Sequence, residues 1–215
     1  MDYQGITSDK NVFLKNDKIN LEKDDIYLSN VAKIGNSAQN IKIIDNVLSN
    51  AEHEKVLNFT KNINSDTWIS QPWDVDIFYS STMPEEIIEI FVKVFQIALN
   101  TSIDFYGVGI NNFDKGSVHL NRWKQGISMP AHIDILSQRS DHIAALYYIN
   151  DDYQGGEINF VEHNFKNKPQ ANSLIMFPGN ENYLHEVLEV SEGIRYTSSI
   201  WFQFTGSNFL GKVKR

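Results

Sequence analysis

The sequence predicts an α+β protein built around a β-sandwich or jelly roll. Two observations carry this prediction. Helical patterns are confined to the part of the chain before residue 105, whereas short β-like runs separated by turn residues fill the part that follows. Because no helices alternate with those runs, a parallel βαβ fold is disfavoured, and many short strands in series are typical of sandwiches and jelly rolls.

The chain has 215 residues, which suits one domain with an added flank. Residues 1–40 are polar and rich in Asn, Lys and Asp, and we interpret them as an N-terminal arm that is partly ordered against the body. Residues 41–215 are expected to form a single domain, with helical support in 41–105 and a jelly-roll core in 106–204. The apolar run Ile41–Ile44 predicts the first strand of that domain.

Two helices are predicted in the supporting segment. Ser49 and Glu52 make a capping box, and apolar residues follow it at a helical spacing. The segment Thr82–Glu85 makes a second capping box, with Pro84 at the first helical position. The wide apolar face over residues 87–99 predicts that this second helix packs flat on a sheet.

Six β-like runs follow the helices. They are Ser117–Trp123, His142–Asn150, Glu157–Glu162, Ser173–Phe177, Tyr183–Val190 and Ile194–Phe204. The turn residues Glu192 and Gly193 separate the last two runs, so we expect these two strands to pair as a hairpin.

The composition excludes several classes of function. The absence of cysteine removes disulfide frameworks, thiolate metal sites and cysteine nucleophiles. Lys and Arg number 19 and Asp and Glu 27, a net charge of −8 that argues against a general nucleic-acid binder. No apolar run approaches the roughly 20 residues of a membrane span, and the N-terminus lacks the pattern of a signal peptide. We therefore expect a cytoplasmic protein with no nucleic-acid or membrane partner.

One histidine stands out by its spacing from a carboxylate. His132 and Asp134 form an HxD pattern, and residues i and i+2 of an extended chain point to the same side. This supplies two-thirds of a 2-His-1-carboxylate facial triad, which binds Fe(II) and leaves positions open. The third ligand has to come from a distant strand, and His142, His163 and His185 are the candidates downstream.

Arg195 follows His185 by ten residues and lies in another β-like run. A buried guanidinium needs an anion, and its planar fork fits a carboxylate in bidentate fashion. The spacing therefore offers a metal ligand together with an anchor for a dicarboxylate cosubstrate. The alternative is a structural arginine paired with an Asp or Glu.

The set formed by His132, Asp134, His185 and Arg195 resembles that of the Fe(II)/2-oxoglutarate-dependent dioxygenases, and most of all their prolyl 4-hydroxylase-type branch. The likeness extends over about residues 106–204. The further segments that carry it are Asn121–Gly126, Met129–His132, Ala145–Asn150, Gly155–Phe160 and Leu174–Pro178.

The resemblance implies a fold and a set of site residues. The family fold is the double-stranded β-helix, a cupin-like jelly roll, here with supporting N-terminal helices. The implied metal ligands are His132, Asp134 and His185. The implied contacts of 2-oxoglutarate are Arg195, on the distal carboxylate, and Tyr148, Trp123, Ser199 and Trp201 around it. The family usually has Tyr where this chain has Trp123, whose indole N–H can only donate.

The resemblance also implies an activity: hydroxylation of an unactivated C–H bond with Fe(II), 2-oxoglutarate and O2, giving succinate and CO2, with ascorbate as a candidate reductant. A prolyl residue of a peptide or protein is the favoured substrate. The alternatives are a free amino acid or another small molecule, and a non-catalytic jelly-roll binding module. Trp201 stands where nucleobase demethylases carry a second Arg, and Asp134 is the carboxylate that halogenating relatives lack.

Two loops are expected to flank the mouth of the site and to act as a lid, Gln71–Ser81 and Ile135–Asp141. Within them, Trp73 and Arg139 are the candidate substrate contacts. Burial against the core is nevertheless the favoured interpretation of both loop tryptophans, Trp68 and Trp73. The sequence carries no signal for the oligomeric state.

Overall fold

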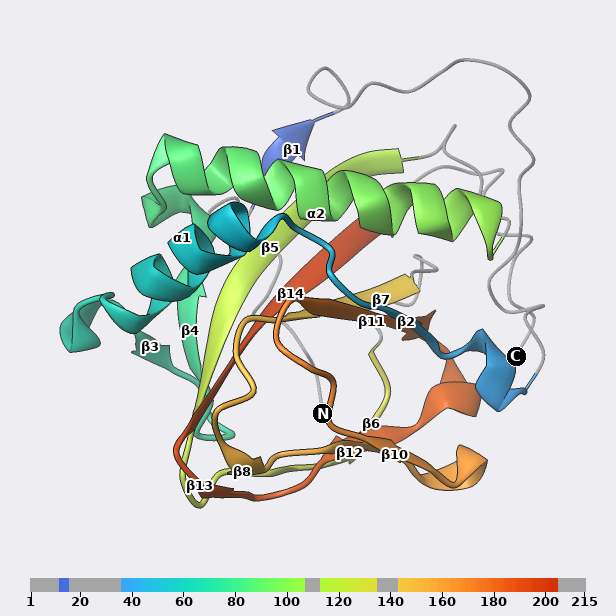
Figure 1. The fold of residues 1–215 in the computed structure, drawn as a ribbon. Coiled ribbons are helices and arrows are strands. Elements are labelled where there is room, and N and C mark those ends of the chain that lie inside the picture. The colour runs from blue at the N-terminus through green and yellow to red at the C-terminus, as the bar shows by residue number, and fades with distance from the viewer. Residues whose placement is uncertain (1–11, 16–35, 107–112, 135–142, 205–215) are drawn as a thin grey trace.

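The structure is a computed structural model that describes residues 12–15, 36–106, 113–134 and 143–204. A large antiparallel sheet is covered on one face by two helices, and a smaller sheet lies across its other face (Figure 1). Two facing antiparallel sheets are the architecture of a jelly roll. The arrangement confirms the predicted α+β class, although the short strands β1 to β4 lie before or between the two helices.

The strands form three sheets. The large sheet has the order β2 (Lys42–Ile44), β11 (Ser173–Pro178), β7 (Ile143–Tyr148), β14 (Ile194–Phe204), β5 (Phe113–Lys124), β4 (Asp76–Tyr79), β3 (Ile69–Ser70), and β1 (Val12–Lys15) also pairs with β5. The small sheet has the order β10 (Phe165–Asn167), β9 (Ile158–Phe160), β12 (His185–Val187), β6 (Met129–His132). A two-stranded ladder joins β8 (Gln154–Gly155) to β13 (Val190–Glu192).

The two helices begin in different ways. Helix α1 (Asn50–Lys61) follows Ser49, and the predicted reciprocal bonds with Glu52 are both present. Helix α2 (Glu85–Asp104) begins after Pro84, which is the N-cap and not the first helical residue, and no side chain caps it. The second predicted capping box is therefore wrong. Thr82 belongs to a short 3-10 turn and donates its hydroxyl hydrogen to the Tyr79 carbonyl instead.

The main core lies between the helices and the large sheet. Phe91, Val94 and Leu99 of α2 are fully buried in one cluster with residues of β5, β7 and β14, so the apolar face predicted for this helix packs on the sheet. Burying a side chain of this size contributes roughly 1.5–3 kcal/mol. Trp68 is in the same cluster, in agreement with the favoured interpretation of that loop residue.

The predicted hairpin between the last two β-like runs is wrong. The run Tyr183–Val190 is divided between β12, in the small sheet, and β13, which pairs with β8. Strand β14 pairs with β5 and β7 in the large sheet. The chain crosses from one sheet to the other after Val187, and backbone bonds from Leu188 and to Glu189 tie the crossing to the turn before β9.

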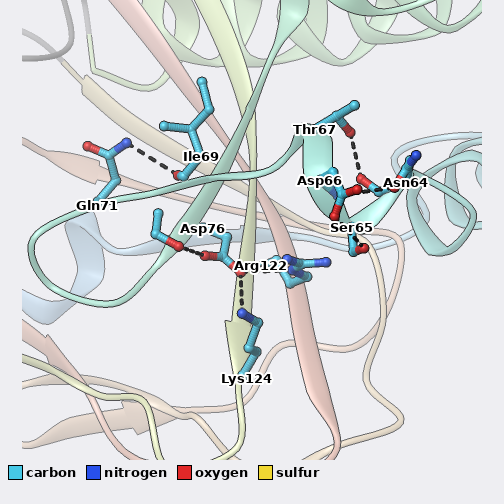
Figure 2. Close-up of polar contacts among 10 residues, drawn as sticks. Asn64, Ser65, Asp66, Thr67, Ile69, Gln71, Asp76, Arg122 and Lys124 are labelled. Carbon is cyan, nitrogen blue, oxygen red and sulfur yellow. Dashed lines mark hydrogen bonds and ion pairs between the residues drawn. The ribbon is translucent and has the colours of Figure 1, made fainter.

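The seam between β4 and β5 is held by a buried ionic network (Figure 2). Asp76 is 1% exposed and accepts hydrogen bonds from Arg122, Lys124 and Ser70. Burial works to raise the pKa of Asp76, but the hydrogen bonds from Ser70, Lys124 and Arg122 outweigh it and lower the pKa to about 2. Arg122 also stacks on Trp68, 4.7 Å from the ring centroid. The network is fully paired and therefore structural.

Within the described ranges, no helix has the combination of length and apolar character needed to cross a membrane.

Candidate functional site

Three side chains with metal-ligating groups meet at the small sheet. Strand β6 carries His132 at its end, Asp134 follows two residues later, and β12 begins with His185. His132 and His185 are direct cross-strand partners with ring centroids 4.4 Å apart. One ligand atom from each of the three residues lies within 4.8 Å of the others. The structure thus brings together the three residues that the sequence singled out as ligands.

Backbone carbonyls orient both imidazoles. Nδ1 of His132 lies 2.9 Å from the Pro130 oxygen, and Nδ1 of His185 lies 3.0 Å from the Tyr183 oxygen. Because a carbonyl only accepts, each Nδ1 carries a hydrogen, and in the neutral form of each ring Nε2 holds the lone pair. These Nε2 atoms face the Asp134 carboxylate at 3.5 and 3.8 Å. A hydrogen bond from Nδ1 to a carbonyl holds a metal-binding histidine in the tautomer that leaves Nε2 for the metal.

The surroundings of the two histidines set their charge differently. Burial lowers the pKa of His185, which keeps its ring neutral. Burial also works to lower the pKa of His132, but the hydrogen bond and negative charge of Asp134 outweigh it and raise the pKa. The rings of Phe177 and Phe160 lie 4.7 and 5.4 Å from the His185 ring. They form an apolar wall that excludes water from one side of the site.

Of the other histidine candidates, His163 is stacked on Tyr183, and its Nε2 is hydrogen-bonded to the Asn182 carbonyl. That nitrogen is already engaged, so His163 does not join the cluster. His142 lies outside the described residues.

Arg195 lies on the inner face of the large sheet, on β14. It is 1% exposed, donates through Nη2 to the Tyr148 hydroxyl at 3.0 Å, and lies 4.9 Å from the Trp123 ring centroid. Within the described part of the chain, its Nε and Nη1 have no hydrogen-bond partner and no carboxylate lies within ion-pair distance. A buried guanidinium of this kind lacks the anion that would compensate its desolvation.

Other polar groups converge on Arg195. The Trp123 indole N–H is buried and has no partner among the described residues. Tyr153, which the sequence analysis missed, is also buried here, and burial raises its pKa while the charge of Arg195 acts in the opposite direction. The Tyr153 hydroxyl lies near the charge of Arg195. Within the described ranges it has no hydrogen-bond partner. Only the three-dimensional fold places Tyr153 at this position.

A glycine leaves space for the guanidinium. Gly156 has φ +66°, and a Cβ there would lie 3.1 Å from each of Arg195 Cδ, Tyr153 and Val190. Both the left-handed backbone and the close approach require glycine. This position could be recognised from the sequence, because Gly156 belongs to the Gly155–Phe160 segment of the resemblance.

The remaining predicted contacts are placed as follows. Ser199 is buried on the same face of β14 as Arg195 and accepts a hydrogen bond from Asn121 at 2.8 Å. Trp201 lies in β14 by its backbone, but its side chain is outside the described set. Trp73 is half-buried and packs against the cluster that contains Trp123. This places one candidate substrate contact beside Trp123, on which Arg195 stacks.

The expected lid is only partly a loop. Within Gln71–Ser81, residues 76–79 form strand β4, so the loop is confined to 71–75. The second expected lid segment, Ile135–Asp141, lies outside the described residues, as does Arg139.

The sequence also matches a known family over this region. Residues 118–203 match the family model of the 2OG-Fe(II) oxygenase superfamily. This segment runs from β5 to β14 and contains His132, Asp134, His185 and Arg195. Residues 118–203 are a 2OG-Fe(II) oxygenase domain. The resemblance stated from the sequence is thereby confirmed.

Solved structures share the fold of this oxygenase domain and its supporting helices. A prolyl-4-hydroxylase from Pseudomonas putida aligns with a TM-score of 0.65 at 16% identity, over 78% of this chain and 94% of that one. A prolyl hydroxylase from Trichoplax adhaerens, in complex with a hypoxia inducible factor peptide fragment, aligns at 0.59 and 17%, over 78% and 84%. The viral collagen prolyl hydroxylase of Paramecium Bursaria Chlorella virus-1 aligns at 0.56 and 20%, over 79% and 98%.

A shorter stretch matches a curated protein. The chain is 36% identical over 64 residues to human prolyl 3-hydroxylase 2. This match covers 27% of this chain and 9% of that protein. The chain therefore matches only a small part of the length of this relative, and the likeness is that of one segment of a domain.

Proposed function

We propose that the 2OG-Fe(II) oxygenase domain hydroxylates a prolyl residue of a peptide or protein, with succinate and CO2 as coproducts. The observation that carries the proposal is the pairing of two half-sites. His132, Asp134 and His185 form a three-ligand cluster, and the buried Arg195 offers donors without an anion among the described residues.

The three ligand residues fit Fe(II). Two imidazoles and one carboxylate form the facial set of non-haem Fe(II) oxygenases, which leaves positions open for other ligands. The two Nε2 lone pairs are directed toward the Asp134 oxygens, and the Nδ1 bonds to Pro130 and Tyr183 hold them there. With no cysteine in the chain, no thiolate competes for the ion.

The surroundings of Arg195 fit the distal carboxylate of 2-oxoglutarate. The guanidinium has Nε and Nη1 available, and the Trp123 indole adds an N–H donor. Tyr148 already bonds to Arg195 and orients it. An Arg–carboxylate pair with additional hydrogen bonds compensates the burial of both charges, which an isolated guanidinium cannot do.

When bound, Fe(II) and 2-oxoglutarate supply the oxidation: O2 gives one oxygen atom to the C–H bond and the other to succinate, with release of CO2. The chain's own residues bind and orient. Arg195 binds the cosubstrate, and the three-ligand cluster of His132, Asp134 and His185 binds the metal. The rings of Phe160 and Phe177 form the apolar wall beside His185.

The prolyl substrate is supported by the names of the structural and curated relatives described above, each of which is a prolyl hydroxylase. Trp73 is the proposed contact for the substrate ring, because it packs beside Trp123 and is only half-buried. Arg139 is proposed as a second contact.

The metal and cosubstrate assignment is tested without a substrate. Anaerobic protein is mixed with Fe(II) and 2-oxoglutarate, and the weak visible charge-transfer band is recorded. We expect the band in the wild type and its loss in His132→Ala. His53→Ala is the matched control, since His53 lies on α1 and bonds to the hydroxyl of Tyr147, a residue of the helix-covered core. A wild type without the band, or an unchanged band in His132→Ala, contradicts the assignment.

The substrate is tested by mass spectrometry of peptides and free amino acids incubated with the loaded enzyme. We expect the gain of one oxygen atom on proline-containing peptides, in step with succinate release, and no gain when the proline is replaced by alanine. Oxygen gain on a free amino acid alone would instead assign a small-molecule substrate.

A further inference from the structure

The inner faces of β5 and β14 carry a group of buried polar side chains, of which only Ser199 is among the expected contacts of 2-oxoglutarate. Asn121, Thr197 and Ser199 are at most 7% exposed, and His119 lies beside them at 3%. Asn121 pairs with Thr197 across the two strands, and His119 pairs with Ser199. The interior of a sandwich is normally apolar, so this polar patch calls for a function.

The patch begins beside Arg195. Thr197 lies two residues after Arg195 and therefore on the same face of β14, and it also pairs with Tyr148 of β7. A carboxylate held by Arg195 would therefore lie next to Thr197. At the other end, burial lowers the pKa of His119 to about 4, and the negative charge of Asp134 acts on the ring in the opposite direction.

The hydrogen bonds of the patch have a direction. The Asn121 amide nitrogen donates to Ser199 Oγ at 2.8 Å and to Thr197 Oγ1 at 3.4 Å. A hydroxyl has one hydrogen and two lone pairs. Because the amide occupies one lone pair on each oxygen, both hydroxyl hydrogens are available to another acceptor, and within the described residues neither hydroxyl donates to a protein group.

We propose that Asn121 is a positioning residue that turns the Thr197 and Ser199 hydroxyl hydrogens toward the 2-oxoglutarate held by Arg195. This inference rests on the proposed function. The amide acts as the fixed donor behind the two hydroxyls, so that both present hydrogens to a carboxylate. Hydrogen bonds to an ionised acceptor are stronger than those between neutral groups. A hydroxyl that is oriented before the ligand binds loses less conformational entropy when it forms such a bond.

The inference is tested by calorimetric titration of 2-oxoglutarate into protein loaded with Mn(II), which reports binding without turnover. We expect Asn121→Ala and Ser199→Ala each to weaken binding about tenfold, or about 1.4 kcal/mol. Ser199→Thr keeps the hydroxyl and is expected to keep the affinity. Asn121→Asp has the same shape but can only accept, so it turns the hydroxyl hydrogens toward itself and is expected to weaken binding further.

Ser198→Ala is the matched control. Ser198 lies between the two hydroxyl residues but on the opposite face of β14, where its cross-strand neighbours Leu120 and Tyr147 belong to the helix-covered core. It removes a buried hydroxyl from the same strand, and the affinity for 2-oxoglutarate is expected to stay unchanged.

The double variant Asn121→Ala/Ser199→Ala separates positioning from general damage. If Asn121 acts through the hydroxyls, the double variant binds about as weakly as the weaker single variant. Fully additive losses, or wild-type affinity in Asn121→Ala, overturn the inference. Should Asn121→Ala fail to fold, wild-type affinity in Ser199→Ala overturns it equally. A wild type that does not bind 2-oxoglutarate overturns the proposed function itself, and the inference with it.

Discussion

Arg122 and Arg195 occupy adjacent positions in the ladder between β5 and β14 but face opposite sides of the large sheet. Arg122 pairs with Asp76 at 2.8 Å and stacks on Trp68, beneath the helices. Arg195 faces the interior of the jelly roll and stacks on Trp123. Both are arginines on a tryptophan, and only the first has a carboxylate within the described residues.

The difference shows how a structural arginine can be told from a binding one. Charge and stacking are common to both sites, so neither property distinguishes a structural arginine from a ligand-binding one. The partner decides, because a buried guanidinium without an anion costs free energy that Asp76 offsets for Arg122. At Arg195 that compensation is left for a ligand to supply. Substitution of Arg122 should therefore change the stability of the fold, and substitution of Arg195 should change ligand binding.

The largest effect is expected from Arg195→Met. Affinity for 2-oxoglutarate should fall at least about 100-fold, because removing one partner of a buried charge pair costs about 2–5 kcal/mol. The free energy of unfolding of the ligand-free protein should be unchanged or higher, since an apolar side chain replaces an uncompensated charge. Calorimetry and urea unfolding measure the two quantities. If Arg195→Met kept its affinity for 2-oxoglutarate but lost stability, Arg195 would be a structural arginine and not a ligand-binding one.

Arg122→Met should have the opposite profile. It leaves the buried Asp76 carboxylate with Lys124 and Ser70 only, and we expect a loss of about 2–3 kcal/mol in the free energy of unfolding. Affinity for 2-oxoglutarate should remain that of the wild type. The double variant Arg122→Met/Asp76→Leu should recover much of the stability. A loss of 2-oxoglutarate binding in Arg122→Met would show that the two faces of the sheet are coupled.

The pH dependence of stability should come from Asp76, the carboxylate that pairs with Arg122. The pKa of Asp76 is lowered to about 2 in the folded protein, so its ionised form stabilises the fold above pH about 4, and this contribution of about 2 kcal/mol is lost as the pH falls toward 2. Urea midpoints measured over this range should fall more steeply in the wild type than in Asp76→Asn. Asp66→Asn changes an exposed carboxylate in the neighbouring turn (Figure 2) and should keep the wild-type slope.

The smallest effect is expected from crowding Arg195. Gly156→Ala places a Cβ 3.1 Å from Arg195 Cδ, and we expect affinity for 2-oxoglutarate to fall about fivefold, or roughly 1 kcal/mol. Gly126→Ala is the matched control, since its φ is +85° but nothing lies within 4 Å of the added Cβ. Both variants carry backbone strain, and only the first should weaken binding. Equal loss of binding in the two would assign the effect to strain.

The parts of the site that the sequence predicted are those set by short-range spacing or by the family resemblance. His132 and Asp134 are two residues apart on one chain segment, so their proximity follows from strand geometry alone. The capping box at Ser49 is local in the same way. His185 and Arg195 lie in different sheets, and their roles follow from the resemblance and not from periodicity.

The parts that the sequence did not predict depend on contacts between distant segments. Tyr153 reaches Arg195 only because Gly156 and Val190 bring their turns together. The division of the run Tyr183–Val190 between two sheets could not be read from its continuous apolar pattern, since apolar residues face a core in both. The second capping box failed because Thr82 is used by the preceding 3-10 turn.

Strand β14 limits how the chain can change in length. Its ladder with β5 runs without a bulge from Ile194 to Gln203, and β7 pairs along its other edge. Inserting or deleting one residue inside the strand would exchange its two faces, so that Tyr196 would face the interior of the jelly roll and Arg195 the helix-covered core. Insertions and deletions of one residue should therefore be tolerated at turns such as Gln125–Gly126. Within β14 they should abolish function, because they change which side chains face the interior.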